Sequence, residues 1–133
     1  MIKLNIKSFI GFIQYNIMDA LIDSSEKTIR WLSKIHDYCI DALLTITYQE
    51  GKYWASFKNS KTKRNFAYLH PTKNQIRIFT RLPEGSDNNL TSTPASQNWA
   101  EMYPTLFILR NANAIEVALD LIEKSYYHDL TID

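Results

Sequence analysis

The sequence predicts a two-layer α+β fold. In this fold an antiparallel sheet of about five strands is packed mainly on one face by N-terminal helices and a C-terminal helix. Apolar residues recur at helical spacing before residue 43 and again after residue 113, whereas the segment between them shows strand-like alternation and turn residues. Because the strands are grouped apart from the helices, this pattern favours an α+β architecture over alternating βαβ units.

The length and composition are those of one soluble globular domain. The chain has 133 residues, 45% hydrophobic and 22% charged, and shows no internal repeat or domain boundary. We therefore expect a single domain over residues 1–133. It consists of a helical part, residues 1–42, followed by the sheet and a closing helix, residues 43–127.

Two helices are expected before the sheet. An apolar stripe from Lys7 to Ile22 predicts the first, either as a core helix or as a dimerisation helix. The second is expected from Asp23 to about Asp41, because Asp23 followed three residues later by Glu26 resembles a capping box.

The strands follow from alternation and from the residues that interrupt it. Glu50-Gly51 is typical of a hairpin turn, and a strand is expected to end before His70-Pro71 because proline cannot donate to a ladder. The predicted strands are Leu43–Gln49, Lys52–Lys58, Arg64–Leu69, Gln75–Arg81 and Tyr103–Arg110.

A long irregular loop and a helix complete the expected fold. Residues 83–98 are rich in Gly, Ser, Asn, Thr and Pro, and Trp99 at their end is expected to anchor this loop onto the domain. The last helix is expected to begin at Asn113, which forms a capping-box pattern with Glu116, and its apolar stripe extends to Tyr126.

The charge distribution gives the strongest functional signal. The net charge is only +1, yet the thirty residues from Lys52 to Arg81 contain eight Lys or Arg and no Asp or Glu. Such a basic segment indicates where an anionic partner could bind.

Aromatic residues alternate with these cations on the predicted strands, which favours nucleic-acid binding. Exposed rings can stack on bases while Lys and Arg neutralise phosphates, giving sequence-tolerant binding of a single strand. The candidate nucleic-acid-binding residues are Lys52, Trp54, Lys58, Lys63, Arg64, Arg77, Phe79 and Arg81. The competing hypothesis is that helices cover this face, so that Trp54 and Phe79 belong to the core and the cations only solvate its rim.

The sequence gives no sign of an enzyme, a metal site or a cofactor. Asp41 with Glu50-Gly51-Lys52 resembles the metal-binding residues of restriction-type nucleases, but a hairpin turn at Gly51 would splay Glu50 and Lys52 apart. The three histidines are scattered, and the three glycines stand alone rather than in a phosphate-binding loop.

The single cysteine, Cys39, excludes an intramolecular disulfide and favours a reducing compartment. Polar residues Gln14, Asn16 and Asp19 interrupt the N-terminal apolar group before it could form a signal-peptide core or a membrane span. We therefore expect a cytoplasmic protein.

Several segments in order resemble a small family of unknown function labelled "predicted transport protein". The resemblance covers residues 43–127 and is carried by Tyr53–Lys58, Arg64–Leu69, Gln75–Leu82, Trp99 and Ala114–Tyr126. Members of that family occur alone or appended to nucleases of the restriction and HNH kinds. The resemblance thus implies an accessory role near nucleic acid, contacting DNA or RNA. The alternative is a protein–protein adaptor or homodimer associated with a nuclease.

Overall fold

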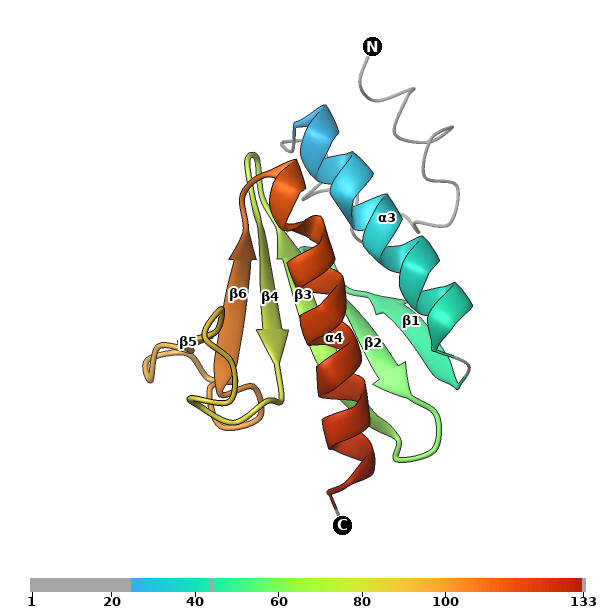
Figure 1. Cartoon of the computed structure of the whole chain (residues 1–133), viewed down its shortest axis with the longest axis vertical. Coiled ribbons are helices and arrows are strands. Elements are labelled where there is room, and N and C mark those ends of the chain that lie inside the picture. The colour runs from blue at the N-terminus through green and yellow to red at the C-terminus, as the bar shows by residue number, and fades with distance from the viewer. Residues whose placement is uncertain (1–24, 44, 133) are drawn as a thin grey trace.

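The computed structural model describes residues 25–43 and 45–132, and its architecture confirms the α+β prediction (Figure 1). The predicted helix Lys7–Ile22 lies outside the described residues. The elements are α3 (Glu26–Ala42), β1 (Ile46–Glu50), β2 (Ala55–Asn59), β3 (Arg64–Pro71), β4 (Ile76–Thr80), β5 (Thr91–Ser92), β6 (Thr105–Leu109), the 3-10 turn η2 (Ala112–Ala114) and α4 (Ile115–Leu130).

The described strands form one sheet of six, in the order β1-β2-β3-β4-β6-β5, and every neighbouring pair is antiparallel. Helices α3 and α4 lie side by side in front of this sheet (Figure 1). Both described helices therefore pack on the same face, as the sequence predicts.

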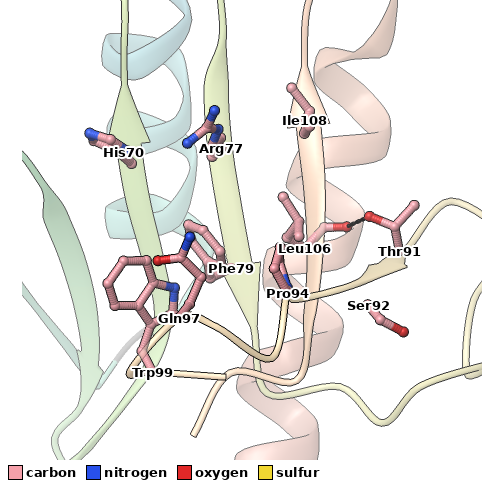
Figure 2. Close-up of a pocket in the computed structure, with 10 residues that line it drawn as sticks. All are labelled: His70, Arg77, Phe79, Thr91, Ser92, Pro94, Gln97, Trp99, Leu106 and Ile108. Carbon is pink, nitrogen blue, oxygen red and sulfur yellow. Dashed lines mark hydrogen bonds between the residues drawn. The ribbon is translucent and has the colours of Figure 1, made fainter. Parts of the chain in front are cut away.

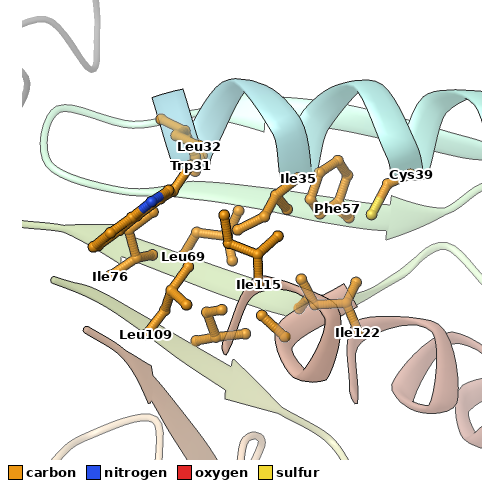
Figure 3. Packing of buried hydrophobic residues seen from close by; sticks show 14 of the residues in the cluster. Trp31, Leu32, Ile35, Cys39, Phe57, Leu69, Ile76, Leu109, Ile115 and Ile122 are labelled. Atoms are coloured by element: carbon orange, nitrogen blue, oxygen red, sulfur yellow. The ribbon is translucent and has the colours of Figure 1, made fainter. Parts of the chain in front are cut away.

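The main core lies between the two helices and this face of the sheet (Figure 3). Side chains of Ile35 and Ile122, from α3 and α4, meet Phe57 and Leu69 from the strands. Cys39 belongs to the same cluster and is fully buried. The helical and strand periods seen in the sequence thus converge on one apolar layer.

The capping residues differ from the predicted ones. Helix α3 begins at Glu26, and its N-cap is Ser25, whose hydroxyl accepts from the backbone N–H of Thr28. The predicted cap, Asp23, lies outside the described residues. At the other helix, Ala112–Ala114 form a 3-10 turn, and α4 then begins at Ile115 with no side-chain cap, so the predicted Asn113 capping box is wrong.

Two strand predictions are also wrong. Strand β3 continues through His70 and Pro71. The pairing of β2 with β3 stops at Ala55 and Leu69, so Pro71 has a strand on one side only and its missing N–H breaks no ladder hydrogen bond. The predicted loop contains the two-residue strand β5, which pairs with β6 at Thr105 and Leu106. This short pairing is why the described sheet has six strands instead of about five.

Ser125 of α4 fastens the helix to the point where β3 and β4 separate. Its hydroxyl donates to the carbonyl oxygen of Phe66 at 2.6 Å and accepts from the backbone N–H of Arg81 at 3.0 Å. The last β3–β4 pair is Ala67 with Thr80, so the hydroxyl bridges backbone groups just beyond the end of the ladder. A buried side chain here satisfies groups that the strands no longer satisfy themselves.

One turn further along α4, Asp129 fastens the helix to the β2–β3 turn. Its buried carboxylate accepts from Asn59 at 3.2 Å, from Thr62 at 2.6 Å and from the guanidinium of Arg64 at 2.8 Å. Arg64 also donates to the backbone carbonyls of Asp129 and Ile132. A cation at the C-terminal end of a helix interacts favourably with its dipole.

We expect Ser125→Ala to lower the free energy of unfolding by about 2–4 kcal/mol. The substitution leaves the carbonyl of Phe66 and the N–H of Arg81 without this hydrogen-bond partner. Each buried backbone group that loses its hydrogen bond costs about 1–3 kcal/mol. Urea denaturation would measure the change. Ser96→Ala, at an exposed loop position, is the control and should stay within about 0.5 kcal/mol of wild type. An equal, small effect of both substitutions would contradict the bridging role.

Candidate nucleic-acid interface

The face of the sheet opposite the helices is called here the second face. Strand alternation places Ser56, Tyr68, Phe79 and Leu106 on it as one cross-strand row, each pairing with the next. A second row of paired residues, His70, Arg77 and Ile108, lies beside it. None of these residues is acidic.

The long loop covers part of the second face. Tyr103 and Trp99 from this loop pack against Tyr68 and Phe79, with ring centroids 5.7–5.9 Å apart. Phe79, Tyr103 and Leu106 form the buried centre of this second cluster. The expectation that Trp99 anchors the loop is therefore confirmed.

The loop and the two rows enclose a cleft of about 560 Å³ (Figure 2). Phe79 and Trp99 lie at one end of it, and His70 and Arg77 lie side by side at the other. Leu106 and Ile108 provide an apolar wall, and the loop segment of Thr91, Ser92, Pro94 and Gln97 forms the remaining sides. The volume is typical of small-molecule and cofactor sites.

Arg77 supplies the positive charge of the cleft. Its side chain is exposed, and among the described residues it has no ion-pair partner. Burial lowers the pKa of the neighbouring His70, and the guanidinium of Arg77 lowers it further. His70 is therefore neutral at pH 7 and can donate or accept a hydrogen bond.

Trp54 precedes β2 and extends the row that contains His70 and Arg77. Since Ala55 pairs with Leu69, Trp54 falls beside His70 at the same end of the second face. Its half-buried indole contacts Tyr68 edge to face at 5.6 Å. An added Cβ at Gly51 would lie 2.2 Å from the indole, so the position of Trp54 requires glycine at residue 51.

Two predicted site residues lie on the second face, but their side chains are occupied by contacts within the protein. Phe79 was expected to be an exposed stacking ring, and it is only 4% exposed because the loop packs over it. Arg81 is half-buried, donates from Nε to the carbonyl oxygen of Asn65 at 2.7 Å, and lies 5.6 Å from the ring of Tyr103. Both residues therefore build the covered part of the face.

The other predicted cations are dispersed. Arg64 is held by Asp129 on the helix side of the sheet, and Lys63 occupies the β2–β3 turn with a positive φ of 65°. Lys58 is half-buried on the second face opposite Asn65, in a row at the far end from Arg77. Lys52 is exposed on the β1–β2 turn, with its ammonium 5.4 Å from the ring of Tyr53.

The structure therefore brings together Trp54 and Arg77 from the predicted set and adds His70, Gln97 and Trp99. The alternation of β3 continued past Tyr68 places His70 on the second face, but Pro71 after it predicts the end of the strand. No period in the loop could have indicated Gln97, because its position depends on turns such as the one from Pro94 to Gln97.

No group of three or more His, Cys, Asp or Glu is placed to hold a metal ion within residues 25–43 and 45–132. In particular Asp41, at the end of α3, and Glu50, on β1, form no such group.

Neither helix that the structure describes combines the length and the apolar content that a bilayer span requires.

Fold and site together define a class of protein: a two-layer α+β domain with helices on one face of its sheet and a loop-bordered cleft on the other. No family model matches the chain, and no curated protein or solved structure is significantly similar to it. The resemblance drawn from its sequence motifs stays a prediction.

We expect Gly51→Ala to displace the indole of Trp54 and to lower the free energy of unfolding by about 1–3 kcal/mol, as overpacking usually does. Urea denaturation and the near-ultraviolet circular dichroism of the tryptophans would measure both effects. The matched control is Gly85→Ala, where nothing lies within 4 Å of the added Cβ but φ is +78°. It should cost backbone energy without changing the tryptophan signal. An unchanged signal in Gly51→Ala would contradict the packing of Trp54 described above.

His70 should make the protein less stable in mild acid. Its pKa is lower in the folded protein than in the unfolded chain, where it is about 6.5. Below that pH the unfolded chain binds more protons, so the free energy of unfolding falls as the pH falls. We expect His70→Gln to remove this contribution. The stability difference between wild type and His70→Gln, measured by urea denaturation, should therefore shift against wild type as the pH falls from about 7.5 to about 5.5, one pH unit on each side of the unfolded-state pKa. If the free energies of unfolding of wild type and His70→Gln changed in parallel with pH, this contribution of His70 would be disproved.

Proposed function

We propose that this protein is a non-enzymatic accessory binding module of the cytoplasm that contacts single-stranded nucleic acid through the second face of its sheet. The observation that carries the proposal is the partly exposed row of Trp54, His70 and Arg77, which joins a ring, a neutral imidazole and an exposed guanidinium without an acidic neighbour in the row.

Electrostatics support this proposal. The guanidinium of Arg77 is exposed, so it can bind a phosphate without first breaking an ion pair among the described residues. Lys52 on the adjoining turn and Arg110 just beyond β6 are also exposed and add positive charge around this end of the sheet. Phosphate contacts of this kind supply most of the affinity of sequence-tolerant binding.

The aromatic contribution is smaller than the sequence predicted. Because Phe79 is covered, Trp54 is the predicted ring that keeps part of its surface accessible on this face. Stacking of one base on an aromatic side chain contributes about 1–3 kcal/mol. A single strand offers such unpaired bases, whereas a duplex does not, so we propose a preference for single strands.

Binding can be measured by fluorescence polarisation with labelled single-stranded DNA, single-stranded RNA and duplex DNA at about 50 mM and about 200 mM salt. We expect single strands to bind more tightly than the duplex and their affinity to fall steeply with salt. Arg77→Glu should weaken binding about tenfold or more and make the salt dependence shallower, because one phosphate contact is lost.

The matched control is Lys34→Glu, which makes the same charge change at an exposed position of α3. It should leave the affinity within about twofold, since α3 lies on the other face of the sheet. Absence of binding by wild type at low salt, or equal effects of the two substitutions, would rule out this function. The alternative role as an adaptor or homodimer predicts self-association or partner binding that persists at high salt.

A further inference from the structure

The cleft on the second face contains polar groups that the described residues leave without hydrogen-bond partners. The Nε1 atom of Trp99 is buried and has no acceptor. The carboxamide of Gln97 lies beside the indole of Trp99 and the ring of Phe79 (Figure 2), and it makes no hydrogen bond within residues 25–43 and 45–132. Gln97 and Arg77 are therefore the unpartnered donors that a ligand in the cleft can reach, whereas the Trp99 N–H has no accessible surface.

The rest of the cleft lining is mixed, with polar side chains of the loop facing apolar side chains of the sheet. Trp99 and Phe79 lie at one end, Leu106 and Ile108 along a wall, and Arg77 at the other end. Arg77 and Phe79 are two residues apart on one strand, which separates them by about 6.6 Å along it. A ligand that fills this cleft thus needs a flat apolar body with acceptors on its edge and an anionic group at one end.

We propose that the cleft binds one nucleotide unit, with its base against Trp99 and the apolar wall and its phosphate at Arg77. Gln97 has both a donor and an acceptor and contacts the edge of the base. This inference rests on the proposed function, because the nucleotide belongs to the bound strand.

The loop fixes the geometry of the residues that would contact the base. Gln97 closes the turn from Pro94 through its backbone N–H, and its own carbonyl accepts from Ala100. Tyr103 donates from its backbone N–H to the carbonyl of Trp99 at 2.8 Å. Gln97 and Trp99 are thus held by backbone bonds, so binding need not order them first.

The inference can be tested with the full chain by polarisation with a labelled single strand. We expect Gln97→Ala to weaken strand binding about 2- to 10-fold, which corresponds to the loss of one hydrogen bond. Asn113→Ala, at an exposed position of η2 outside the cleft, is the control and should have no effect. Trp99→Phe keeps an aromatic anchor for the loop but gives the base a smaller ring to pack against, and should also weaken binding.

Competition separates the cleft from the charged surface. Each of the four deoxynucleoside monophosphates is added to the protein bound to the labelled strand, with inorganic phosphate at the same concentration as control. We expect a monophosphate to displace the strand and to quench tryptophan fluorescence in a Trp54→Phe background, and phosphate alone to do neither.

The outcomes distinguish the two proposals. Strand binding that depends on Arg77 but is insensitive to Gln97→Ala, Trp99→Phe and monophosphates overturns the cleft inference and leaves the proposed function standing. Binding of a monophosphate without any strand binding supports the cleft as a nucleotide site and overturns the proposed function. If neither ligand binds, both proposals are wrong.

Discussion

The rest of the structure depends on how helix α4 is fastened across the sheet. Ser125 and Asp129 are one helical turn apart, and they contact β3 at Phe66 and Arg64 respectively. These polar contacts fix the height and direction of the helix, whereas the apolar stripe from Ala118 to Tyr126 supplies its burial. Because α3 packs beside α4, both helices occupy one face of the sheet. The opposite face is covered only in part, by the loop.

Much of the fold could be predicted because it follows from periodicity. The class, the two described helices, the five longer strands and the inward direction of Ile76 and Ile78 all follow from helical or strand alternation in the sequence. The predictions that were wrong concern helix caps and a strand end, which depend on local geometry. Ser25 caps α3 and no side chain caps α4, while Pro71 stays in a strand because its neighbour strand has already ended.

The candidate site could be predicted only in part, because side chains compete for partners that are distant in sequence. Arg64 lies opposite Asn59 on the helix side of the sheet, where it is held by Asp129, a residue 65 positions later. Phe79 lies on the predicted face, but Trp99 and Tyr103 cover it through contacts that no sequence period reports. Arg77 stays accessible because its paired neighbours, His70 and Ile108, lie beyond the covered row.

Cys39 gives the protein an internal reporter. Burial, with a further contribution from the nearby carboxylate of Glu123, raises the pKa of its thiol to about 12. At pH 8 only about one thiol in ten thousand is then ionised, and the thiolate is the form that alkylating reagents attack. The rate of alkylation in native buffer would therefore report how often Cys39 becomes accessible, as when α3 separates from the sheet, without any introduced probe.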